Sequence, residues 1–328
     1  MALVAETKVL VTGGCGYVGA RLVGALLERG ADVVVWGRAM QRSARAEVRP
    51  PAAARVETVD LSDATAVRAL PPERFDYVFH LAGNTDFTGS VEHPYEDFVD
   101  NAVATVNVLE FIRRRSPESC FIFSSSAHVY GEGSDEEISE TMRGEPVSPY
   151  GASKLCAEHY VRLYARIYGL RTAIARLFPV YGPGLRRYVV FDFIQKLAAD
   201  PSVLRIHGDG SQVRDLNYVD NVVDALTTIA SEARFDGDVY NVASGTLVSI
   251  ADLAVLIAAA MHVAPRLEFS GELAAGAIAR LIPDIRALVG LGYRSRVSLR
   301  DGLARMAAWL EWERGGNSLA APKRESGS

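Results

Sequence analysis

The chain has 328 residues, of which 49% are hydrophobic and 23% charged, and it carries a formal net charge of -5 at pH 7. A chain of this length can bury a large core and is too long for a single small module, so we expect one large and one small domain. The net negative charge provides no general basic field, which argues against nucleic acid and against an anionic membrane surface as partners.

The cysteines are scattered along the chain as Cys15, Cys120 and Cys156, without metal-ligand spacing or evident pairing. This usage predicts a reducing compartment and no metal site. The first residues run into a hydrophobic strand without a cleavable signal pattern, and the longest apolar stretch, residues 253–260, is too short to span a bilayer. We therefore expect a cytoplasmic protein.

Short β-branched runs alternate with stretches of helical period over the first 178 residues. This order is typical of an α/β protein with a Rossmann-type, doubly wound parallel sheet and helices on both faces. The predicted strands are residues 8–13, 31–36, 54–60, 75–83, 120–126 and 171–178. The predicted helices are residues 17–29, a short one from 63, 94–115 and 149–168.

After residue 178 the elements become shorter and more mixed, which predicts a smaller mixed α/β domain for the substrate. Residues 215–221 and 238–244 are hydrophobic enough to return to the large sheet, so the two domains should be interwoven. We expect a dinucleotide-binding domain of residues 1–178 plus about 215–243. The substrate domain should comprise about 179–214 plus 244–314, and the polar residues 315–328 predict a disordered tail.

The motif TGGCGYVG spans residues 12–19, where a predicted strand passes into a helix. In this context Gly13 permits the tight turn, Gly16 lets the backbone approach a pyrophosphate, and Gly19 lets the helix pack closely on the sheet. The helix N-terminus then receives the phosphates. The motif therefore predicts a dinucleotide site.

The next strand ends in Gly37 and Arg38, where an NAD site usually carries an acidic residue for the adenosine ribose. A missing carboxylate removes repulsion toward a ribose phosphate, and a guanidinium can pair with that phosphate in bidentate fashion. We therefore expect NADP, with NAD as the alternative cofactor. Asp60 and Leu61, at the end of the following strand, are expected to border the adenine ring.

Tyr150 and Lys154 are four residues apart at the start of the helix predicted at 149–168, so both side chains should lie on one face. A tyrosine has a pKa of about 10 in water. It can exchange a proton at neutral pH only if its phenolate is stabilised, which a nearby ammonium does. The strand at 120–126 ends in hydroxyl side chains and should lie beside this helix. Ser126, Tyr150 and Lys154 are therefore the candidate catalytic residues.

Seven motifs spread over nearly the whole chain resemble those of the extended short-chain dehydrogenases/reductases, in the group called NAD-dependent epimerases/dehydratases. These motifs are TGGCGYVG, HLAG, SSSAHVYG, YGASK, VYGPG, GDGSQVRDLNYV and RLIPDIRALVGLGY. The resemblance implies a nucleotide-diphosphate sugar as substrate, and a homodimer formed through the helices at 94–115 and 149–168. It also implies that Ser126 hydrogen-bonds the sugar oxygen, that Tyr150 moves the proton and that Phe178 packs near the nicotinamide.

From the glycine motif and the resemblance together we expect a defined set of cofactor-binding residues. The set is Gly13, Gly16, Tyr17, Val18, Gly19, Gly37, Arg38, Asp60, Leu61, Leu81, Ala82, Gly83, Ser124, Tyr150, Lys154 and Phe178.

The resemblance also implies that Arg214 and Arg280 grip the nucleotide diphosphate, since each guanidinium offers paired planar donors. Two positions depart from the family pattern. Pro179 stands where many relatives have an asparagine near the diphosphate, and Asn221 replaces a common aspartate, which we interpret as a capping difference. The expected substrate-binding residues are Asn84, Ser126, Ala127, His128, Pro179, Arg214 and Arg280.

Family members that remove water or carbon dioxide carry acidic residues just after the catalytic hydroxyl, because those steps need a further acid or base. Here these positions are Ala127 and His128, which argues against a 4,6-dehydratase and against a decarboxylase. We expect His128 to be a packed residue rather than a proton shuttle, and His80 to be a hydrogen-bonded residue at a strand end.

The absence of an acid at Gly37 and Arg38 favours a reductase that consumes NADPH. The sequence therefore predicts a 4-ketoreductase of a nucleotide-linked 4-keto-6-deoxyhexose, with a nucleotide-sugar 4-epimerase, similar to UDP-galactose 4-epimerase, as the alternative. Reduction of a non-sugar carbonyl is a further alternative. A non-catalytic NADP sensor is disfavoured because Tyr150 and Lys154 are both kept.

Overall fold

The computed structural model describes residues 6–38, 51–132, 136–271 and 280–315. Its main layer is a seven-stranded sheet with the order β11-β6-β5-β4-β1-β2-β3, in which every strand pair is parallel. This is the doubly wound arrangement that the sequence predicts. The strands are β1 (Lys8–Thr12), β2 (Asp32–Gly37), β3 (Arg55–Thr58), β4 (Tyr77–His80), β5 (Cys120–Ser126), β6 (Arg171–Leu177) and β11 (Asp236–Val242).

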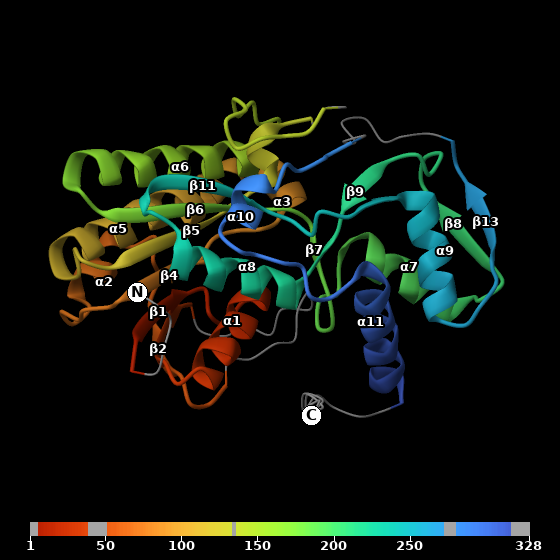
Figure 1. Ribbon diagram of the computed structural model, residues 1–328, viewed down its shortest axis with the longest axis horizontal. Coiled ribbons are helices and arrows are strands. Elements are labelled where there is room, and N and C mark those ends of the chain that lie inside the picture. Colours follow the sequence, from red (N-terminus) through yellow and green to blue (C-terminus); the bar gives the residue numbers. More distant parts are fainter. Residues whose placement is uncertain (1–5, 39–50, 133–135, 272–279, 316–328) are drawn as a thin grey trace.

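The central strands are apolar on both faces because helices cover both sides of the sheet (Figure 1). Val9 and Val11 of β1 face a core shared with α1 (Tyr17–Glu28) and α8 (Val219–Glu232). Leu10, between them, faces the opposite core. That core is shared with α5 (Ala104–Arg115) and α6 (Pro149–Tyr168), while α2 (Ala64–Ala69) packs on α5.

The helix predicted at 94–115 is continuous but contains a wide turn. It consists of α4 (Pro94–Phe98), a π-helical turn at Val99–Val103, and α5. The backbone N–H of Ala104 bonds to the carbonyl of Val99, five residues back, which is the π pattern. α3 (Phe87–Glu92) precedes α4, and a 3₁₀ turn at Ala127–Tyr130 follows β5.

A separate hydrophobic core, which includes Phe193, Leu253 and Trp309, holds the smaller domain. It is built on three two-stranded ladders, whose strands pair β10 with β7, β12 with β9 and β13 with β8. The strands are β7 (Val180–Tyr181), β8 (Val203–Ile206), β9 (Val213–Asp215), β10 (Asn217–Tyr218), β12 (Leu247–Ser249) and β13 (Arg266–Phe269). The helices are α7 (Tyr188–Ala199), α9 (Ile250–Ala260) and α11 (Leu299–Arg314), while α10 (Arg286–Gly290) packs on β11.

One of the two segments predicted to return to the large sheet does so. β11 pairs with β6 at the sheet edge, as predicted. The segment 215–221 does not enter that sheet, because Asn217 and Tyr218 pair with Val180 and Tyr181 of β7 instead. The exact domain boundaries remain a prediction.

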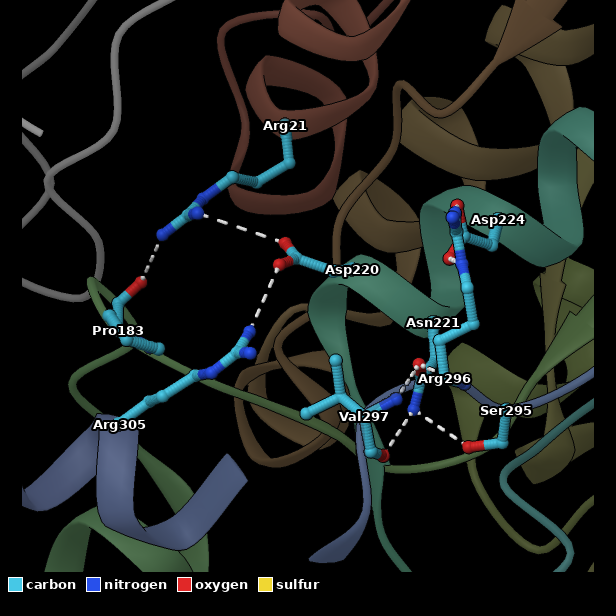
Figure 2. A network of polar contacts seen from close by, with 9 residues as sticks. All are labelled: Arg21, Pro183, Asp220, Asn221, Asp224, Ser295, Arg296, Val297 and Arg305. Atoms are coloured by element: carbon cyan, nitrogen blue, oxygen red, sulfur yellow. Dashed lines mark hydrogen bonds and ion pairs between the residues drawn. The ribbon is translucent and has the colours of Figure 1, made fainter. Parts of the chain in front are cut away.

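Three helices meet at Asp220, the second residue of α8 (Figure 2). Its carboxylate forms ion pairs with Arg21 of α1 at 3.8 Å and with Arg305 of α11 at 3.9 Å. Arg21 also donates to the carbonyl of Pro183 at 3.1 Å. These contacts tie the large sheet's helix layer to the last helix of the smaller core.

The capping interpretation of Asn221 is wrong, because its side chain instead holds the segment before α11 (Figure 2). Its amide nitrogen donates to the Ser295 hydroxyl at 2.8 Å and to the Val297 carbonyl at 2.9 Å. Its amide oxygen accepts from the backbone N–H groups of Arg296 and Val297. An aspartate could not donate to the Val297 carbonyl, so the amide is the group that satisfies this buried position.

Residues 316–328, most of the predicted tail, lie outside the described residues. Within the described ranges, no helix has both the length and the apolar character needed to cross a membrane.

Candidate active site

A large cavity of about 3570 Å³ lies at the carboxyl ends of the parallel strands, between the main sheet and the smaller domain. This is the edge where ligands bind in open α/β sheets. Residues that directly follow four of the strands line it, namely Gly13, Arg38, Leu81 and Phe178. Parallel pairing therefore brings together segments that are distant in the sequence.

The glycine turn after β1 forms the floor of this cavity. Gly13 has a φ of 70°, and a Cβ on it would lie 2.6 Å from the backbone nitrogen of Ala82, so the turn excludes a side chain here. Gly16 donates its N–H to the Gly13 carbonyl at 2.8 Å and precedes α1 without a side-chain cap. A Cβ on Gly19 would collide with the same carbonyl. The helix N-terminus is thus open toward the cavity, which fits an anionic group.

Arg38 does not present a free guanidinium to this site. It donates to the carboxylate of Asp100, in the π-helical turn, and lies 3.7 Å from the carboxylate of Asp60. The Ser62 hydroxyl and backbone N–H both donate to Asp60, and they hold its pKa below the usual range for an aspartate. Two carboxylates from other segments therefore surround the arginine that the sequence offered for a ribose phosphate.

Tyr150 and Lys154 lie in the first turns of α6, as predicted. Ser148 caps this helix by accepting the N–H of Gly151 at 3.1 Å. The ammonium of Lys154 donates to the carbonyl of Ser124 at 3.2 Å. Both side chains are buried and line the cavity.

Ser126, the last residue of β5, hydrogen-bonds the hydroxyl of Tyr150, so the structure brings all three candidate catalytic residues together. Burial raises the pKa of Tyr150 to about 12, and this hydrogen bond partly opposes the rise. Burial lowers the pKa of Lys154 to about 8, which the carboxylates of Asp97 and Glu158 oppose. The lysine is therefore mostly charged at neutral pH, and it loses its proton at a pH only slightly above neutral.

Sequence reasoning missed Asp97, a fully buried carboxylate behind this group. It accepts hydrogen bonds from the side chains of Asn84 and Asn101, both at 3.0 Å, and from the Ser153 hydroxyl at 2.6 Å. The available signal was the spacing of Asp97 and Asn101, which places two polar residues on one face of a helix that covers the sheet.

Both histidines of interest are packed and neutral, as expected. His80 bonds Thr12 at 2.6 Å and Thr105 at 3.0 Å, and burial lowers its pKa to about 3. The ring of His128 lies 4.8 Å from that of Phe87 and 5.5 Å from that of Tyr150. Burial also lowers the pKa of His128. This ring forms a wall of the site beside the tyrosine.

The two arginines predicted for the diphosphate differ in position. Arg214 lines the cavity together with Asn84, Ala127 and Pro179. Arg280 is exposed, pairs with Val213 in a single β-bridge, and is not among the described residues that line the cavity.

Sequence reasoning also missed Arg187, which lies just before α7. It donates to the hydroxyl of Thr85 at 2.9 Å, and both residues line the cavity. Tyr188 follows it with a positive φ of 69° and contacts the Arg187 guanidinium through its ring. No local motif announces this group, because its partner Thr85 lies in a segment after β4.

Known proteins have similar sequences and structures over nearly the whole chain. The family model described as the NAD dependent epimerase/dehydratase family matches residues 9–243. A UDP-glucose 4-epimerase of Mycolicibacterium smegmatis is 33% identical over 306 residues, which cover 91% of this chain and 96% of that protein.

Solved structures agree with the sequence comparison. A UDP-glucose 4-epimerase of Thermus thermophilus in complex with NAD has a TM-score of 0.78 and 30% identity, covering 93% of this chain and 99% of its own. A UDP-glucose 4-epimerase of Thermotoga maritima with UDP-glucose has a TM-score of 0.82 and 28% identity, covering 94% of this chain and 100% of its own. The chain therefore belongs to the NAD-dependent epimerase/dehydratase family and is an oxidoreductase of the short-chain dehydrogenase/reductase class that modifies nucleotide sugars.

Proposed function

We propose that this protein is an NAD-dependent nucleotide-sugar 4-epimerase. The observation that carries the proposal is the pairing of Arg38 with Asp60 and Asp100. An NADP-dependent ketoreductase needs a charge, such as a free arginine, that is available to the ribose phosphate. Two carboxylates offset that charge and would repel the phosphate, while the ribose hydroxyls of NAD can donate hydrogen bonds to a carboxylate. The similarity to UDP-glucose 4-epimerases supports the same proposal.

The site fits a dinucleotide. The glycine turn leaves no room for side chains at Gly13 and Gly19, and the uncapped start of α1 provides open backbone donors for a pyrophosphate. Arg38, Asp60 and Leu61 would border the adenosine end. Ser124 in the last part of β5, Lys154 near the start of α6 and Phe178 just after β6 would border the nicotinamide end.

NAD would supply a hydride acceptor that later returns the same hydride to the sugar. In this proposal Tyr150 takes the proton from the sugar 4-hydroxyl. It gives the proton back after the 4-keto sugar has rotated in the site and presents its other face. Ser126 hydrogen-bonds the same sugar oxygen. Lys154 keeps a positive charge beside the tyrosine, which stabilises the phenolate that forms.

At the substrate end we assign Arg214 to the diphosphate, because this residue lines the cavity and a guanidinium offers paired planar donors. Phe87 and His128 form an aromatic wall beside Tyr150, against which an apolar face of a sugar ring can pack. Arg280 keeps a proposed role only as a residue of the outer rim, because its side chain is exposed.

We also propose a cytoplasmic homodimer. α4 packs on α6, and these helices expose an apolar face that includes Tyr95, Phe98, Leu163 and Ile167. Leu163 and Ile167 are four residues apart, so they lie on one side of α6. An apolar face of this kind on two adjacent helices fits a second copy of the chain. The three free cysteines fit a reducing compartment.

The deciding experiment incubates the purified protein with NAD and either UDP-glucose or UDP-galactose, and follows the sugars by chromatography. The expected result is interconversion of the two sugars without net formation of NADH. Stoichiometric loss of NADPH with a nucleotide-linked 4-keto-6-deoxyhexose, without any epimerisation, would overturn the proposal in favour of a ketoreductase.

A further inference from the structure

Asp97 is a buried carboxylate behind the catalytic residues, and its oxygens accept hydrogen bonds from polar side chains. Within the described ranges, it forms no salt bridge with an arginine or lysine within 4.0 Å. Its three hydrogen-bond donors are the neutral side chains of Asn84, Asn101 and Ser153. A buried charge without a close cation is costly, so an aspartate at this position needs a reason other than packing.

The hydrogen bonds of Asp97 fix the orientation of Asn101. A carboxylate only accepts, so the amide nitrogen of Asn101 must face Asp97 and its amide oxygen must face the other way. That oxygen is buried and has no hydrogen-bond partner. This oxygen and the ammonium of Lys154 both lie against Gly83. A Cβ added to Gly83 would collide with the Asn101 oxygen and would come within 3.2 Å of the Lys154 nitrogen.

The other groups that face Lys154 do not provide a free negative charge. Glu158, one turn further along α6, is neutralised by Arg176, which donates to its two oxygens at 2.9 and 2.6 Å. His80 of β4 is a buried histidine hydrogen-bonded to two threonines. Asp97, on α4, is thus the carboxylate near the lysine whose charge no arginine offsets.

We propose that Asp97 is a positioning residue that acts through Lys154: it supplies the counter-charge of the buried ammonium and, through Asn101 and Ser153, fixes the side chains around it. This inference rests on the proposed function, in which Lys154 must be charged to stabilise the phenolate of Tyr150. Asp97 itself touches neither sugar nor proton in this proposal.

The electrostatics agree with this geometry. Burial lowers the pKa of Lys154 to about 8, and Asp97 is the largest influence that opposes the lowering. Without Asp97, the pKa of the lysine should fall further, and the ammonium should be lost nearer to neutral pH. Burial is the main cause of the raised pKa of Tyr150, and Tyr188 and Asp97 raise this pKa further. Arg187 lowers it.

The test compares Asp97→Asn with wild type in the pH dependence of kcat for epimerisation. The substitution keeps the size of the side chain and one acceptor, and the Ser153 hydroxyl can still donate to the carbonyl of Tyr150. We expect the alkaline limb of the profile to move down by about one pH unit, with less than a twofold change in KM for the sugar. An alkaline limb at the wild-type pH would overturn the inference.

Ser153→Ala is the matched control, because it removes one hydrogen bond to Asp97 but leaves the charge. Its kcat is expected to fall while its alkaline limb stays where wild type has it. If the limb of this variant moved as far as that of Asp97→Asn, hydrogen bonding rather than charge would be responsible, and the counter-charge role would be refuted.

A measurement on the wild type covers the case in which Asp97→Asn does not fold. The chain has four lysines, at positions 8, 154, 196 and 323, so an NMR titration of ¹³C-labelled lysine can resolve Lys154, with Lys154→Arg for assignment. A midpoint near 8 is expected, and a midpoint below about 6 would show that no counter-charge acts on the ammonium. Absence of epimerisation by the wild type would instead refute the proposed function, whatever midpoint the lysine shows, which separates the two failures.

Discussion

Arg187, from the segment that leads into α7, donates a hydrogen bond of 2.9 Å to the hydroxyl of Thr85, which follows β4. Both residues line the cavity, so the contact connects the smaller domain with the segment after β4, and the guanidinium lies close enough to influence the pKa of Tyr150. We expect Arg187→Ala to raise KM for the nucleotide sugar roughly tenfold, which corresponds to about 1.4 kcal/mol.

Arg186→Ala is the control for this prediction, since Arg186 points to Glu313 of α11, at 2.8 Å, and to the ring of Trp309. It should lower the melting temperature and leave KM within about twofold of the wild-type value. Steady-state kinetics and thermal unfolding measure both effects. Equal KM values for Arg187→Ala and wild type would contradict a role of Arg187 in binding the nucleotide sugar.

Tyr150→Phe should reduce kcat by about 10²-fold to 10⁴-fold, because it removes the group that exchanges the proton. In the wild type, activity should fall as the pH rises through about 8, where Lys154 loses its proton and no longer stabilises the phenolate. Rate measurements between pH 6 and pH 10 check both parts. Tyr164→Phe, on the same helix but bonded to Glu110, is the control and should keep wild-type kcat.

Asp100→Asn should weaken the preference for NAD over NADP. The substitution removes one of the two carboxylates that offset Arg38, so the guanidinium becomes more available to a ribose phosphate. We expect the ratio of the dissociation constants to shift toward NADP by about fivefold, or ~1 kcal/mol. Calorimetric titration with each cofactor measures the ratio, and high salt should shrink the shift. In the double variant with Arg38→Met the shift should vanish; its persistence there would rule out Arg38 as the cause.

The buried ion pair between Arg176 and Glu158 should be important for stability. Both side chains are almost inaccessible, at 4% and 2%, and the guanidinium also contacts the ring of Tyr130. Arg176→Met leaves a buried carboxylate unpaired, so we expect the free energy of unfolding to fall by about 3–5 kcal/mol in urea denaturation. Arg114→Met, which breaks an ion pair with Glu110 on the exposed side of α5, should be indistinguishable from wild type. Similar effects for the two variants would contradict the assignment.

The proposed homodimer can be tested on the apolar face of α6. Leu163→Glu together with Ile167→Glu puts two charges where a second copy is expected to pack. The dissociation constant of the dimer should then rise by at least about hundredfold, which sedimentation at micromolar concentration would show as monomer. Val255→Glu, at an equally exposed apolar position on α9, should remain dimeric. A monomeric wild type would reject the homodimer.

Sequence reasoning succeeded where a residue's role follows from its neighbours along the chain. The turn at Gly13, the start of the helix at residue 149 and the shared face of Tyr150 and Lys154 each depend on a few consecutive residues, and all three are present in the structure. The core strands followed from short apolar runs, because a sheet covered on both faces needs them. The parallel sheet and the helices on its two faces followed from the alternation of strands with helices.

The remaining features depend on contacts between distant segments. Nothing near Arg38 in the sequence shows that Asp100 pairs with it, since only the strand order brings the π-helical turn to the end of β2. Asn221 likewise has its partners at 295–297, far along the chain. The topology of the fold decides which charged side chains pair. The cofactor preference predicted from Arg38 alone therefore could not take its carboxylate partners into account.

The π-helical turn at Val99–Val103 is, in effect, one residue inserted into a regular helix. One additional residue changes the phase between the two halves of the rod by about 100°. With that phase, Asp97 bonds the amide of Asn101, whose oxygen lies beside Gly83 and the ammonium of Lys154, while Asp100 reaches Arg38. One helical segment therefore contributes to both the proton end and the adenosine end of the site. The length of this segment is therefore as much a determinant of the chemistry as the identity of its side chains.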